Sequence, residues 1–130
     1  MALITEAQWR VDVGTAHVTD LTADDATTIA AVLEQASDFV QEYATAAGVT
    51  LTAGGLTAAM RRRVSVIASY YAADAKPEYR DAQGDNAYLR RYAGAKAELQ
   101  EWADRIRSLS SDDVSEGPLV LSEDARGWNA

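Results

Sequence analysis

Residues 88–109 read YLRRYAGAKAELQEWADRIRSL and carry the clearest structural pattern in the chain. Apolar side chains recur there every three or four positions, at Tyr88, Tyr92, Ala95, Leu99, Trp102, Ile106 and Leu109. This spacing places them all on one side of an α-helix. Because Asp85 or Asn86 can cap its N-terminus, the pattern predicts a helix over residues 86–109.

Two other segments show the same helical period. The first predicts a helix over residues 24–47, with Thr22 as its N-cap and Gly48 closing its C-terminus. The second predicts a helix over residues 57–74, and Pro77 sets a limit beyond it. The middle of the chain is therefore expected to be helical almost throughout.

The first residues contain a capping-box pattern, Thr5 followed three positions later by Gln8, which predicts a short helix through Trp9. Residues 10–21 have no clear period. Three apolar stripes can close a core only by facing one another, so we expect an all-α fold. The expected architecture is a small antiparallel bundle of three main helices plus the short N-terminal helix. A self-associating coiled coil over residues 88–109 is the alternative, although two tyrosines and a tryptophan on its seam favour a mixed core.

Composition excludes several classes of function. The chain has 130 residues, enough for one domain, and 12 Lys and Arg against 20 Asp and Glu, for a net charge of −8. That balance disfavours a protein that grips nucleic acid or anionic lipid. Cysteine is absent and there is one histidine, which excludes disulfides, thiolate zinc sites and multi-histidine metal sites. No signal peptide or membrane span is recognised, so we expect a soluble protein made in the cytoplasm and no membrane partner.

Charge is distributed unevenly along the chain. Residues 1–60 contain 8 acidic and 1 basic residue, residues 61–111 contain 7 and 10, and residues 112–130 contain 5 and 1. A mixed, solvated surface is one explanation. Head-to-tail association, in which a basic face of one copy meets an acidic face of the next, is the other.

Residues capable of catalysis are few. His17 is followed by Asp20, and such a pair could orient a general base or hold a metal, but no nucleophile motif accompanies it. We therefore interpret His17 as an incidental loop histidine. The pairs Asp24–Asp25 and Asp112–Asp113 are explained by helix capping or by a solvated linker. The sequence predicts neither an enzyme nor a cofactor or metal site.

Two clusters of arginines are candidates for binding a partner. They are Arg61, Arg62 and Arg63, and Arg90 and Arg91. Three consecutive arginines between core positions are expected to fan over the exposed half of their helix, where they can meet phosphates or the acidic residues of a neighbouring subunit. Given the net charge of −8, we favour subunit contacts. A small helical regulator that binds nucleic acid through these arginines is the alternative function.

The C-terminal segment has apolar residues without an amphipathic helix to carry them. Residues 1–111 are expected to form the helical domain and residues 112–130 a linker and docking arm, with the helix ending near the Ser110-Ser111-Asp112-Asp113 run and Gly117-Pro118 beyond it. The arm could fold back on its own helices, or it could dock on another protein. Trp and Arg are frequent interface anchors. The candidate partner-binding residues are Leu119, Val120, Leu121, Arg126 and Trp128.

Four segments, in order, resemble the small head–tail connector (adaptor) proteins of tailed phages and Mu-like prophages. The segments are Val32–Tyr43 with its Ala-Ser-x-x-Val-x-x-Tyr pattern, Ile67–Tyr71, Arg91–Ala103 with Arg-Tyr-x-x-Ala, and Ser122–Trp128, in which an aromatic follows glycine. The likeness covers about residues 24–128. Residues 48–57 depart from it, because they lack the proline-rich connector that is common in these proteins.

The resemblance implies a structural protein of the virion, located in the neck at the head–tail junction. Such proteins form a ring of about twelve copies between the portal and the stopper or tail-completion protein, and their C-terminal arm commonly reaches the portal. The resemblance further implies that DNA passes through the lumen without specific binding. Acidic walls would favour that passage.

Overall fold

The computed structural model describes residues 2–116, with side chains described for residues 2–109. Within this range the chain is helical, and an isolated bridge between Arg80 and Asn86 is its sole β-type pairing. The expected all-α class is confirmed. The α-helices are α1 (Glu6–Val13), α2 (Thr15–Thr22), α3 (Ala26–Ala46), α4 (Ala58–Asp74) and α5 (Leu89–Glu116), and the 3₁₀ turns are η1 (Ala53–Gly55) and η2 (Pro77–Tyr79).

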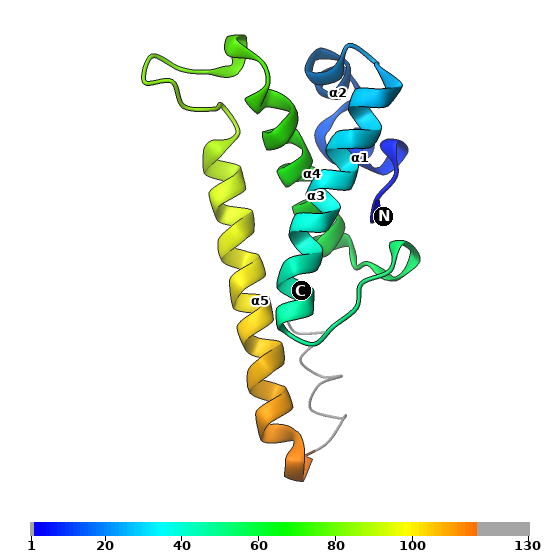
Figure 1. Cartoon of the computed structure of the whole chain (residues 1–130), viewed down its shortest axis with the longest axis vertical. Helices are drawn as coiled ribbons and strands as arrows, with labels where there is room; N and C mark the ends of the chain where they lie inside the picture. The colour runs from blue at the N-terminus through cyan, green and yellow to red at the C-terminus, as the bar shows by residue number, and fades with distance from the viewer. Residues whose placement is uncertain (1, 117–130) are drawn as a thin grey trace.

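The three long helices lie side by side (Figure 1). Helices α3 and α5 run in one direction. Helix α4, which lies between them in the sequence, runs in the opposite direction. The short helices α1 and α2 pack on α4, and α5 continues well beyond the end of α3 (Figure 1). One end of the molecule is therefore formed by α5 alone among the described helices.

The core consists largely of the side chains that the helical period singled out. Leu33, Val64 and Leu99, one from each long helix, are all buried. The N-terminal segment contributes Trp9, Val18 and Leu21, which are at most 1% exposed and cover the outer face of α4 and α3. Residues near the ends of the stripes, such as Tyr43 and Ile106, pack on the core but stay partly exposed.

Helix α2 was not predicted, because residues 10–21 hold two short helices instead of one periodic segment. Gly14, with φ +100°, separates α1 from α2. Each helix has eight residues, too few to be stable without tertiary contacts. The predicted capping box is confirmed, since Gln8 N donates to Thr5 Oγ1 at 3.1 Å and Thr5 N donates to Gln8 Oε1 at 2.9 Å.

The prediction that Thr22 caps the first long helix is wrong. Thr22 is the last residue of α2, and its hydroxyl donates to the carbonyl of Val18 at 2.7 Å. Asp25 caps α3 instead, because its carboxylate accepts a hydrogen bond from the backbone N–H of Thr28 at 3.1 Å.

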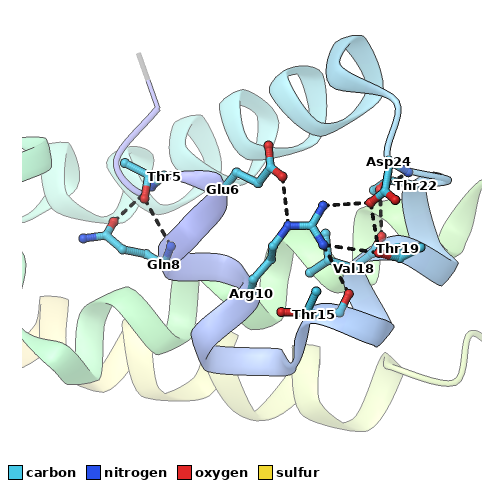
Figure 2. A network of polar contacts seen from close by, with 9 residues as sticks. All are labelled: Thr5, Glu6, Gln8, Arg10, Thr15, Val18, Thr19, Thr22 and Asp24. Carbon is cyan, nitrogen blue, oxygen red and sulfur yellow. Dashed lines mark hydrogen bonds and ion pairs between the residues drawn. The ribbon is translucent and has the colours of Figure 1, made fainter.

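The turn between α2 and α3 places two consecutive non-glycine residues in the left-handed region, Ala23 at φ 54° and Asp24 at φ 57°. Figure 2 shows the Arg10 guanidinium holding this turn from α1. Arg10 donates to Glu6 and to Asp24, each at 2.8 Å, and also to the carbonyl of Thr15 at 3.2 Å. One side chain thus joins α1, the start of α2 and the left-handed turn.

Two predicted helix boundaries are confirmed. After α3, Gly48 at φ 79° lets the N–H of Val49 reach the carbonyl of Ala44 at 2.8 Å, the pattern of a glycine-closed helix end. Thr57 caps α4 through a 3.1 Å bond from the N–H of Met60 to its hydroxyl.

The last helix differs from its prediction at both ends. It begins at Leu89 instead of residue 86, because Asn86 is buried and uses its side chain to accept from Tyr88 N and to donate to Tyr70 O. It continues through Glu116, so the predicted helix end at residue 109 is wrong. Ser and Asp are only modest helix formers, but none of these residues is the Gly or Pro that would stop a helix.

Candidate functional site

The arginines of α4 do not fan together into solvent. Arg62 is exposed, but Arg63 turns toward α5 and pairs with Glu98, Nε to Oε1 at 3.1 Å, with its side chain only 13% exposed. Arg61 is half-buried and lines a small hollow of about 170 Å³ between α4 and α1. The expectation of an exposed three-arginine patch is therefore wrong for Arg63, which ties two helices of the same chain together.

The second arginine pair lies further along the molecule. Arg90 is exposed, and the Arg91 guanidinium lies 6.0 Å from the centroid of the Tyr88 ring. Arg91 precedes Glu98, the partner of Arg63, by seven residues, or roughly 10 Å of helix. The two arginine clusters are therefore spread along the long axis and do not form one compact basic patch.

His17 lies in helix α2, not in the loop that the sequence suggested. Its exposed ring has Nδ1 3.3 Å from the hydroxyl of Tyr88, at the start of α5. Burial raises the pKa of Tyr88, so the phenol stays protonated and can donate to Nδ1 in the tautomer that leaves this nitrogen without a proton. Among the side chains of residues 2–109, no three acidic or histidine residues come together as metal ligands. The contact links His17 of α2 to Tyr88, the residue before α5.

The structure brings together an aromatic cluster that the sequence analysis did not single out. Tyr70 and Tyr92 stack with centroids 3.9 Å apart and planes at 5°, and Lys96 Nζ lies 4.7 Å from the centroid of Tyr92. The ring centroid of Phe39 lies 5.5 to 6.2 Å from the ring centroids of Tyr43, Tyr71 and Tyr92. The sequence did contain a signal for such a cluster. Phe39 and Tyr43, and likewise Tyr88 and Tyr92, are aromatic residues four positions apart, which places each pair on one face of a helix. We refer to Phe39, Tyr43, Tyr70, Tyr71 and Tyr92 as the aromatic face.

All five rings of the aromatic face are partly exposed. Burial nevertheless raises the pKa of Tyr70 and of Tyr71, so their hydroxyls stay protonated and act as neutral hydrogen-bonding groups. Tyrosines that combine a large apolar ring with a polar tip are enriched at protein interfaces.

A groove continues from this aromatic face toward the free end of α5. Its volume is about 310 Å³, near the lower limit of the roughly 300–1,000 Å³ typical of ligand pockets. Two alanines, Ala46 on α3 and Ala103 on α5, leave the space between the helices open. The lining residues are Phe39, Glu42, Tyr43, Ala46, Gln100, Ala103 and Arg107.

The groove has a mainly apolar and aromatic lining with a few polar side chains. Its lining contains no serine, cysteine or histidine that could act as a nucleophile or a proton shuttle. Its charges are Glu42 and Arg107, and Arg107 pairs with Asp104 one turn earlier on α5. Apolar and aromatic walls with one acidic and one basic residue at the rim are typical of a surface that receives a peptide anchor.

The predicted docking residues Leu119, Val120, Leu121, Arg126 and Trp128 lie outside the described residues. Comparisons of the chain with known protein families, with curated proteins and with solved structures found no match. No helix among residues 2–116 has both the length and the apolar character that crossing a bilayer requires.

Proposed function

We propose that this chain is a structural, non-enzymatic subunit of a head–tail connector of the tailed-phage type. In this proposal about twelve copies form a ring in the virion neck, between the portal and the stopper or tail-completion protein. The observation that carries the proposal is the long helix α5, which extends past α3 at one end of the molecule (Figure 1). An apolar, tryptophan-containing sequence follows that helix within a few residues.

The body of the subunit is proposed to be a small antiparallel bundle of α3, α4 and α5, braced by α1 and α2. Such a body can hold its shape while its surfaces contact neighbouring copies. Arg61, Arg62, Arg90 and Arg91 are the candidates for contacts to acidic residues of the next subunit. Arg63 leaves this set, since its guanidinium is already engaged by Glu98.

The charge of the chain is consistent with a ring around DNA. A net charge of −8 per copy gives the assembly a strongly acidic surface, which repels phosphates and lets DNA pass without specific binding. We propose that residues 119–128 form the docking arm, with Leu119, Val120, Leu121, Arg126 and Trp128 contacting the portal or the neighbouring subunit.

Deletion of residues 117–130 tests the docking arm. The truncated chain should keep its helical circular dichroism and its melting temperature, because the buried core described here lies within residues 2–109. It should lose co-sedimentation with purified portal rings. The matched pair of variants in the full chain is Leu121→Ala and its neighbour Ser122→Ala, of which only the leucine change should weaken portal binding. Collapse of the helical signal, or portal binding at the level of the intact chain, would contradict the proposal.

A further inference from the structure

The groove between α3 and α5 is an open surface with aromatic residues in its lining. The rings of the aromatic face are partly buried, as are several aliphatic side chains at the edge of the core, and among residues 2–109 the large apolar side chains with more than a third of their surface exposed are Val11 and Leu89. Phe39 and Tyr43 form one wall of the groove, with ring centroids 5.5 Å apart and planes at 65°. Ala103, only 1% exposed, lies between the helices opposite them. This geometry leaves space for one large side chain with the edge or face of two rings beside it.

We propose that this groove receives the C-terminal segment of a neighbouring copy, with Trp128 as its anchor. This inference rests on the proposed ring and names the receptor surface for the arm. Among the last fourteen residues, Trp128 is the largest apolar side chain, and Arg126 precedes it by two positions. Glu42 in the lining provides a carboxylate for Arg126, while the other charged lining residue, Arg107, is paired with Asp104.

The length of the chain beyond α5 fits this arrangement. Helix α5 ends at Glu116, nine residues past Arg107, so it extends roughly 13 Å beyond the groove of its own subunit. Residues 117–128 can then span up to about 40 Å when extended. A neighbour of this size has its centre roughly 25–30 Å away. The segment can therefore reach the next groove.

A closed ring gives this contact a further consequence. When each subunit gives one arm and receives one arm, every groove is filled and no copy exposes an unpaired aromatic wall. The receiving groove is formed entirely by described residues, so it can be tested independently of the portal.

Cross-linking tests the inference directly, because the natural chain has no cysteine. One chain carries Ala46→Cys in the groove and a second, distinguishable by mass, carries Asn129→Cys beside the anchor. A short bismaleimide is added to the mixed full-length proteins. The matched control replaces Ala46→Cys by Ala30→Cys, an exposed alanine on the opposite face of α3. We expect roughly 10-fold or more hetero-dimer with Ala46→Cys than with the control. Trp128→Ala in the second chain should reduce this yield to the control level.

Two results would overturn the inference. One is a hetero-dimer yield no higher than that of the Ala30→Cys control. The other is a double variant, Ala46→Cys with Asn129→Cys, that cross-links within single chains at every dilution, which would show that the segment fills its own groove. Either result can occur while the full-length chain still binds portal rings, so failure here is distinguishable from failure of the proposed function.

Discussion

The indole Nε1 of Trp9 donates a hydrogen bond to the hydroxyl of Ser69 at 3.0 Å, although sixty residues separate the two in the chain. Both side chains are inaccessible to solvent. The Ser69 hydroxyl in turn donates to the carbonyl of Ser65 at 3.0 Å, and the Ser65 hydroxyl donates to Asp12 at 2.7 Å. A row of buried and partly buried polar contacts therefore fixes α1 on α4 in one register.

Ser69→Ala should destabilise the protein by about 1–3 kcal/mol, because it leaves the indole N–H of Trp9 buried without an acceptor. Urea unfolding followed by circular dichroism measures this change. Ser108→Ala, at an exposed position on α5, is the control and should shift the unfolding free energy by no more than about 0.5 kcal/mol. Equal effects of the two substitutions would show that the buried hydrogen bond does not stabilise the α1–α4 contact.

Asp24→Asn should lower stability in a pH-dependent manner. Hydrogen bonds from Arg10 and then from Thr19 hold the pKa of Asp24 below its ordinary value of 3.8. A carboxylate with a depressed pKa in the folded state contributes stability above its unfolded pKa, and loses that contribution as the pH falls through the folded one. The difference in unfolding free energy between wild type and Asp24→Asn should therefore be largest at about pH 6 and should shrink below about pH 4.

A double-mutant cycle with Arg10→Met tests whether the Arg10 guanidinium causes this difference in stability. Asparagine tolerates the left-handed backbone at position 24, so the substitution adds no new strain. In the Arg10→Met background, Asp24→Asn should change the unfolding free energy much less than it does in the wild type. An undiminished effect in that background would assign the stabilisation to something other than the guanidinium.

Ala23→Gly should stabilise the protein. Ala23 has φ 54°, and a left-handed alanine carries roughly 1–2 kcal/mol of strain that glycine does not, partly offset by the larger backbone freedom of glycine when unfolded. The net gain should be about 0.5–1 kcal/mol, measured as a rise in the urea midpoint. Ala31→Gly is the control, because Ala31 is exposed in the interior of α3. There glycine should lower the unfolding free energy by about 1 kcal/mol. A loss at both positions would contradict the strained turn.

The nucleic-acid alternative leads to a different expectation. Replacing Arg61, Arg62, Arg90 and Arg91 by alanine should not alter retention on immobilised DNA at about 150 mM salt, because the intact chain itself should not be retained. The physical reason is the net charge of −8, together with the spread of the arginines along the molecule. Retention that disappears on these substitutions would instead support a nucleic-acid-binding regulator.

The sequence alone determined the three long helices and most of their buried faces. Helical period is local information, carried by each segment itself, and Leu33, Val64 and Leu99 could be assigned to the core without knowing their partners. The closure at Gly48 is local for the same reason, since it depends on atoms within a few residues.

Only the tertiary structure decided the N-terminal pair of helices and the surfaces between helices. Residues 10–21 become helical because Val18 and Leu21 are buried and Arg10 reaches across to Asp24, contacts that no short window of sequence contains. The same holds for Arg63, which local spacing placed in solvent and the packing of α4 on α5 placed against Glu98. The groove likewise requires two small residues, Ala46 and Ala103, on helices that meet only after folding. Its shape is a property of the assembled helices, because the free energy of packing depends on neighbours that lie far apart in the chain.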